Sequence, residues 1–430
     1  MAYYRSTAFE NILATSGIDA LLAQANGLLD TPGQLAQGAA LLKELHANQS
    51  KWRKTETLCS WRRPYLLFQG LLTAANHSGD TKEGERIWGE KKSLLPELRR
   101  HGLEGLKFEA ELRNRRSINL MDQFRFDEAI EMLRELVSER TRLVDSAVTE
   151  YGFTQEALDN FSDDSLAACL GSLGQSLAVS GGKGIDEALT CLFKAIALFK
   201  NQSDRERQWI YLGHLACEQP DSGLPLWERV SNALPELKMS ELVSGHGNQY
   251  KLALQLKGLL VFAAPKNIAK SLEMFETAVE SYSLEARQSH PFGLIHQAAA
   301  ICAIRLQNEL PSEKQSAWGD FANHQFNLAS THMATGGAIL QLLSSASRLR
   351  QQIFRLSYIP STAASKAYQQ LASTICDFLA LASKPPLDAS WRTDELGRRS
   401  GHFVALDPGD SVPIAKRAEA LLSGIRLNYW

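Results

Sequence analysis

The sequence lacks the short motifs that mark most catalytic and metal-binding sites. None of its ten histidines stands in an H-E-x-x-H or Glu-x-x-His arrangement, so the commonest helical zinc and di-iron sites lack their ligands. The glycine-rich run at residues 180–184 lacks the first glycine and the Ser/Thr of a phosphate-binding loop, and no G-x-S-x-G element occurs. We therefore predict no catalytic residue, no metal ligand and no cofactor, and we expect a protein that is not an enzyme.

The sequence also lacks an excess of charge, long apolar runs and paired cysteines. The 46 Lys and Arg residues nearly balance the 48 Asp and Glu residues, which removes the strongest general reason to expect nucleic acid or an anionic membrane as partner. No run has the length of a membrane span, and residues 1–17 show no signal-peptide pattern. The six cysteines form no C-x-x-C pair, which is typical of reduced thiols, so we expect a cytoplasmic protein without a membrane partner.

What the sequence does contain is helical periodicity, most clearly at residues 165–200. Two apolar stripes flank the glycine-rich run, and Asp186 and Glu187 follow it where a helix dipole favours carboxylates. The stripes consist of Leu166, Leu170, Leu173 and Leu177 before the run and of Ala188, Leu192, Ala195 and Phe199 after it. Because small residues such as Gly174 let two helices approach closely, the stretch predicts a helical hairpin that stacks on others.

The order of large and small residues in this hairpin resembles a tetratricopeptide repeat. The framework positions are Leu170, Leu173, Gly174, Leu177, Ala188, Leu192 and Ala195, with leucine in place of the usual Trp, Tyr and Phe. Four further stretches are similar, centred on Gly70, Ser117, Gly213 and Gly258. Successive centres lie 47, 57, 39 and 45 residues apart, whereas the family repeats every 34 residues or so. We therefore expect an irregular array.

The resemblance implies an all-α fold, a right-handed superhelical solenoid of antiparallel helix hairpins. We assign residues 1–55 to N-terminal capping helices, residues 56–384 to the repeat array, and residues 385–430 to a turn-rich tail with a final helix. Beyond the five hairpins, we expect helices at 9–14, 18–29, 31–47, 88–100, 103–121, 126–151, 154–161, 290–306, 313–332, 338–356, 362–382 and 413–423, and a short strand-like segment at 402–406. Thr31 is the expected N-cap of the third of these helices.

The resemblance also implies that function lies in surface shape. In tetratricopeptide arrays the first helices of successive hairpins line a concave groove that holds an extended peptide or a partner helix. The matching groove positions here are Asn114, Gln175, Arg207, His214 and Gln255, with apolar Ile118, Ile210 and Leu259 beside them. Such a mixed groove suits a protein segment that offers apolar anchors and backbone hydrogen bonds. We therefore expect a scaffold, adaptor or sensor subunit that binds a peptide or partner protein.

Two alternatives from other classes stay open at this point. One is a helical nucleic-acid-binding subunit, in which the basic clusters at 51–63 and 99–116 form a stripe that contacts a strand. The other is a regulatory subunit of a larger enzyme complex whose catalytic part is another chain. The sequence predicts no oligomeric state.

Four histidines lie close together in the sequence, at His290, His296, His324 and His332. A metal site would need at least three of them to converge, and no spacing among them requires that. We therefore interpret them as core or surface residues of one hairpin.

Overall fold

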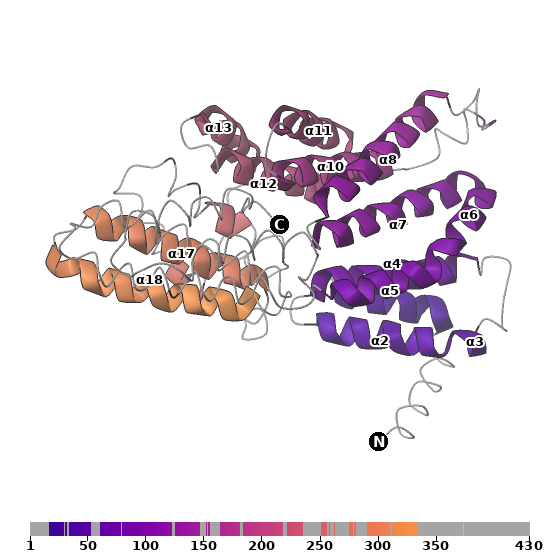
Figure 1. Ribbon diagram of the computed structural model, residues 1–430, viewed down its shortest axis with the longest axis horizontal. Helices are drawn as coiled ribbons and strands as arrows, with labels where there is room; N and C mark the ends of the chain where they lie inside the picture. The colour runs from indigo at the N-terminus through magenta and orange to yellow at the C-terminus, as the bar shows by residue number, and fades with distance from the viewer. Residues whose placement is uncertain are drawn as a thin grey trace, which may run out of the picture.

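The computed structural model describes residues 17–52, 61–146, 164–234 and 290–333, with short gaps, and a few residues outside these stretches (Figure 1). All regular secondary structure in the described residues is helical, which confirms the predicted all-α class. Several expected elements lie outside the described residues, and so does the tail as a whole. These elements are the ones expected at 9–14, 154–161, 338–356, 362–382, 402–406 and 413–423.

A helix at residues 17–29 comes first, and the labelled helices follow it in chain order. Their bounds are α2 Leu35–Ala47, α3 Gln49–Trp52, α4 Arg62–Ser78, α5 Thr81–Lys91, η2 Lys92–Leu94, α6 Leu95–Leu98, η3 Arg99–His101, α7 Gly102–Asp122, α8 Phe126–Ser146, α10 Ser165–Ser180, α11 Ile185–Leu198, α12 Gln202–Cys217, α13 Leu224–Ala233, α17 His290–Glu309 and α18 Ser312–Met333.

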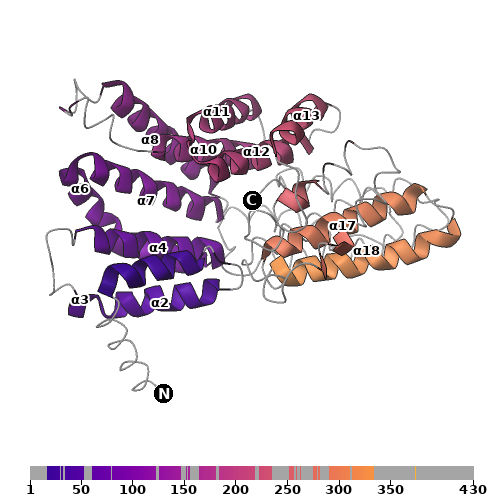
Figure 2. The same cartoon turned by 180° about the vertical axis from the view of Figure 1, so that it is seen from behind.

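The helices between α4 and α13 pack in successive pairs. The pairs are α4 with α5, α7 with α8, α10 with α11, and α12 with α13. The first helices also contact one another in order, α4 on α7, α7 on α10 and α10 on α12, and each second helix touches the first helix of the next pair. Figures 1 and 2 show these pairs following one another, with α17 and α18 forming a separate antiparallel pair.

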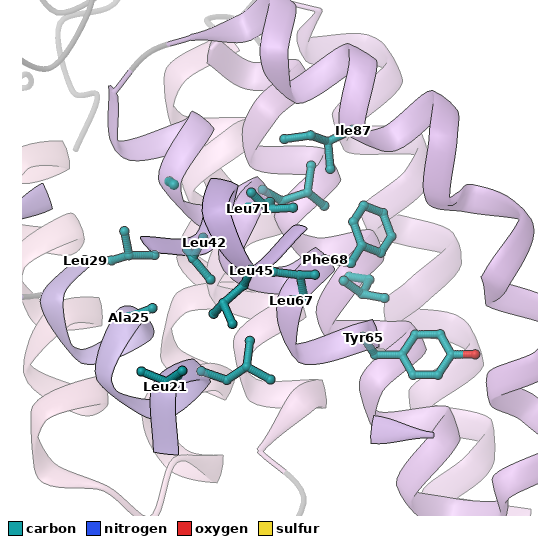
Figure 3. Close-up of a cluster of buried hydrophobic side chains, with 14 of the residues drawn as sticks. Leu21, Ala25, Leu29, Leu42, Leu45, Tyr65, Leu67, Phe68, Leu71 and Ile87 are labelled. Atoms are coloured by element: carbon teal, nitrogen blue, oxygen red, sulfur yellow. The ribbon is translucent and has the colours of Figure 1, made fainter. Parts of the chain in front are cut away.

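Apolar cores run from pair to pair without a break in the central part. The N-terminal core joins residues 17–29 and α2 to α4, α5 and α7, and Figure 3 shows Leu42 and Leu45 near its centre with Phe68 to one side. A second cluster joins α7, α8, α10, α11 and α12, and a third joins α11, α12, α13 and Leu254. The N-terminal helices therefore share their core with the first pair.

A small residue lies where the helices of a pair come closest. A Cβ on Gly174 of α10 would lie 2.7 Å from Leu192 Cγ and 3.0 Å from the carbonyl oxygen of Ala188, both on α11. Gly213 of α12 is packed as closely as Gly174, since a Cβ added there would lie 3.0 Å from Val230 Cγ1 on α13. Hence the glycines picked out by the repeat resemblance do lie at helix contacts.

Two predicted helix boundaries are wrong. The helix expected at 31–47 begins at Leu35, and Thr31 lies in the preceding turn, where its hydroxyl donates to the Gly27 carbonyl oxygen (2.9 Å). The helix expected at 88–100 is broken, because α5 ends at Lys91 and three short turns follow. Pro96 lies in the first turn of α6, where its ring nitrogen, which cannot donate a hydrogen bond, is tolerated.

The central crossing provides the first test. Gly174→Leu should force α10 away from α11 and lower the free energy of unfolding by about 1–3 kcal/mol, the usual effect of overpacking. The control is Gly89→Leu, because Gly89 is a helical glycine whose Cβ position has no atom within 4 Å. Urea unfolding followed by circular dichroism should show the control unchanged or slightly stabilised, since leucine favours a helix more than glycine does. An equal loss of unfolding free energy in both variants would contradict a close helix contact at Gly174.

Candidate functional site

Polar side chains follow one side of four consecutive first helices. Within each helix they are spaced at i, i+3, i+4 or i+7, so they share a face, and each is at least partly exposed. We call this surface the polar face; it consists of Gln69 and Asn76 of α4, Glu111, Asn114 and Arg115 of α7, Ser172 and Gln175 of α10, and Asp204, Arg207 and Tyr211 of α12. These four helices contact one another in the same order along the array.

Hydrogen bonds fix the α4 and α7 parts of the polar face against each other. Gln69 Nε2 donates to Glu111 Oε2 (3.2 Å), and Asn76 Nδ2 donates to the Arg115 carbonyl oxygen (3.0 Å). Burial raises the pKa of Glu111, while the charges of Lys107 and Arg115 act in the opposite direction. A carboxyl group in this position is therefore easier to neutralise than an exposed one.

The α12 part of the polar face centres on Tyr211 and Arg207, which are one helical turn apart. Burial raises the pKa of Tyr211, and the guanidinium groups of Arg207 and of Arg115 from α7 oppose that change. Two cations from different helices thus act on one phenol. Arg207 is exposed, and it pairs with no carboxylate among the described residues.

The structure brings three of the five predicted partner-binding residues onto this face. Asn114 and Gln175 are partly exposed and Arg207 is exposed, on three neighbouring helices. His214 is buried, with 4 % of its surface exposed, next to the place where Leu254 packs on Gly213. Gln255 is partly exposed at the end of a helical segment, residues 251–255, which Lys251 joins to α12 through an ion pair with Glu206.

The other members of the polar face were not predicted from the sequence. The repeat resemblance assigned groove positions to α7, α10 and α12 but none to α4, and it left the helical turns before and after those positions unassigned. The helical period carries the missing signal, because Glu111 and Tyr211 lie three or four residues from Asn114 and Arg207 on the same stripe.

The basic clusters at 51–63 and 99–116 are largely neutralised where the structure describes them. Their arginines hold carboxylates in the pairs Arg62–Glu104 (2.7 Å), Arg63–Asp19 (2.8 Å), Arg99–Glu109 (2.7 Å), Arg113–Glu139 (2.7 Å) and Arg116–Glu85 (2.7 Å). Trp61 is partly buried and stacks on His101 at 4.0 Å between ring centroids, so its faces are not free for a base. Residues 53–60 lie outside the described part of the chain.

Two of the four clustered histidines meet between α17 and α18. The rings of His296 and His332 stack 5.2 Å apart, and His296 Nδ1 forms a hydrogen bond with Gln325 Oε1 (2.6 Å). The pKa of His296 is lowered to about 4, mainly by burial and to a smaller extent by the charges of His332 and His324, while the hydrogen bond with Gln325 acts in the opposite direction. His324 is exposed, and the His290 side chain lies outside the described residues. Within the described part of the chain, no group of three or more His, Cys, Asp or Glu side chains is placed to hold a metal ion.

Comparisons with known proteins add no assignment: no family model, curated protein or solved structure matches this chain. Among the described helices, none has the length and apolar character needed to cross a membrane.

The buried histidine pair predicts a pH-dependent opening of α17 and α18. Because the folded-state pKa of His296 lies below its ordinary value, the hairpin has its full stability above about pH 6.5 and loses it as the pH falls toward 4. The expected loss is about 1.4 kcal/mol per pH unit for each proton taken up on opening. Hydrogen exchange of the α17 amides, corrected for the intrinsic pH dependence, measures it.

Two variants separate His296 from other titrating groups. His296→Phe keeps a ring against Phe292 and should make the pH dependence shallower by about one proton, whereas His324→Gln, at an exposed position, should leave it unchanged. An unchanged slope in His296→Phe would contradict the assignment.

Proposed function

We propose that this chain is a non-enzymatic, cytoplasmic scaffold or adaptor that binds an extended segment of another protein along the polar face. The proposal includes the architecture: a right-handed solenoid similar to a tetratricopeptide array. The observation that carries it is that four consecutive first helices, which contact one another in order, each bear a stripe of polar side chains that are at least partly exposed.

The pattern of helix contacts supports the solenoid. First helices that touch in sequence, with each second helix bridging to the next pair, form an array in which neighbours alone share a core. The small residues Gly70, Ser117, Gly174 and Gly213 are all buried in these contacts. An array of this kind presents one long surface to a partner instead of a closed pocket.

The chemistry of the polar face supports a protein segment as the ligand. Side-chain amides both donate and accept hydrogen bonds, so Asn114 and Gln175 match the N–H and C=O groups of an extended backbone. Ile118, one turn along α7, adds a partly buried apolar contact of the kind that anchors a side chain. Glu111 accepts a hydrogen bond from the amide of Gln69, and we assign no reaction to the pair.

The ion pairs of the basic clusters favour this proposal over the nucleic-acid alternative. A strand is held by cations that replace its counterions, and an arginine that already holds a carboxylate contributes little to that exchange. The cytoplasmic part of the proposal rests on Cys169, Cys191 and Cys217, which are buried free thiols.

Site-specific photo-cross-linking tests the proposal. A photoreactive amino acid in place of Gln175 on the polar face should give a protein adduct in native extract that survives nuclease treatment. The same amino acid in place of Lys194, exposed on α11, is the control and should give none. Equal adducts from both positions, or adducts that nuclease removes, would contradict the proposal.

A further inference from the structure

A segment between α5 and α7 lies on the array without belonging to its helix pairs. We call it the strap; it consists of η2, α6 and η3, residues 92–101. The helices α4, α5 and α7 contact one another directly, so they do not need the strap to join them. The strap also supplies most of the excess length between Gly70 and Ser117, which are 47 residues apart instead of about 34.

Three contacts of different kinds hold the strap against α4 and α7. Leu98 is fully buried in the N-terminal core. Arg99 donates to both carboxylate oxygens of Glu109 (2.7 Å each), and Glu109 is only 6 % exposed. The ring of His101 stacks on Trp61, with 4.0 Å between the ring centroids. An apolar anchor, a bidentate charge pair and a stacked ring are the contacts that a bound peptide makes with its receptor.

The strap ends at a residue suited to be a hinge. Gly102 has φ +65° and ψ −148°, which a residue with a Cβ adopts only at considerable cost. Each of the three turns has only three or four residues, too few for a stable helical ladder of its own. Most of the strap faces solvent, with exposed side chains at Lys92, Ser93, Pro96, Glu97, Arg99 and Arg100.

The site under the strap defines the chemistry of a segment that could replace it. Glu109 loses a charge-assisted pair when the strap leaves, and only another cation restores that pair. The space filled by Leu98 requires an apolar side chain directly before that cation. One helical turn fits the site, because α6 is one turn long and packs both Leu95 and Leu98 on the N-terminal core.

We propose that the strap is an internal ligand, and that a helical turn of a partner protein with leucine followed directly by arginine takes its place when the strap swings out at Gly102. The contacts of the strap with Trp61 and Glu109 involve no residue of the polar face. The inference therefore concerns a second binding site and does not depend on the proposed function.

Fluorescence anisotropy of a labelled peptide with the sequence of residues 91–102 tests the proposal on the full chain. The apparent affinity of a site that its own strap occupies falls with the fraction of open chains. Leu98→Ala removes the apolar anchor of the strap and leaves the site intact, so this variant should bind the peptide about tenfold or more tightly than the unaltered chain does. The control is Leu212→Ala, at a fully buried leucine of another core, which should leave peptide binding unchanged.

A second variant covers the case in which Leu98→Ala does not fold. Arg99→Gln changes a side chain that is 58 % exposed, and it should also bind the peptide more tightly than the unaltered chain does, because the strap loses its ion pair. Peptides that themselves carry Leu98→Ala or Arg99→Gln should bind to these variants at least tenfold more weakly than the original peptide.

Several outcomes would overturn the proposal. Equal peptide affinity in the unaltered chain and both strap variants, or an equal gain in Leu212→Ala, would show that no site is uncovered. Undiminished binding of the altered peptides would remove the predicted chemistry. In native-state hydrogen exchange of the unaltered chain, the strap amides should exchange through a local opening; exchange only by global unfolding, together with α7, would show that the strap does not swing out.

Discussion

The close approach of helices at small residues is the constraint on which the rest of the structure depends. At Gly174 a single methyl group would already meet Leu192 and the backbone of Ala188. The crossing therefore fixes how α11 lies on α10, and through their shared core how both lie on α8 and α12. Close-packed interiors do not absorb such a displacement locally. The orientation of each pair is thus transmitted to its neighbours.

The polar face follows from that arrangement. Each first helix buries its apolar side against its own partner and the next pair, which leaves one stripe partly exposed. The first helices contact one another in order, and residues nearly a hundred positions apart, such as Arg115 and Arg207, act on the same phenol, that of Tyr211. A row of amides, two carboxyl groups and two guanidinium groups is suited to recognition along a chain.

Local patterning predicted much of this from the sequence. Gly174 and Gly213 were identified because small residues among large ones at helical spacing indicate a crossing. Asn114, Gln175 and Arg207 were assigned from the groove positions that the repeat resemblance implies. Gly293 was missed, although its Cβ would lie 2.8 Å from Met333 Cγ, because the α17–α18 pair has none of the repeat framework around it. The burial of His214 depends on tertiary packing, and the break near Pro96 depends on a missing backbone donor. Apolar periodicity in the sequence reports neither of these. The electrostatic effect of Arg115 on Tyr211 could be found only once the order of the helices in space was known.

Hydrogen exchange of the full chain, alone and with the protein partner recovered through residue 175, tests the central claim most directly. The account predicts slower exchange in the partly exposed stripes of α7, α10 and α12, with α8, α11 and α13 unchanged. Protection confined to the second helices, or protection of α17 and α18 alone, would contradict a binding surface on the first helices of the array.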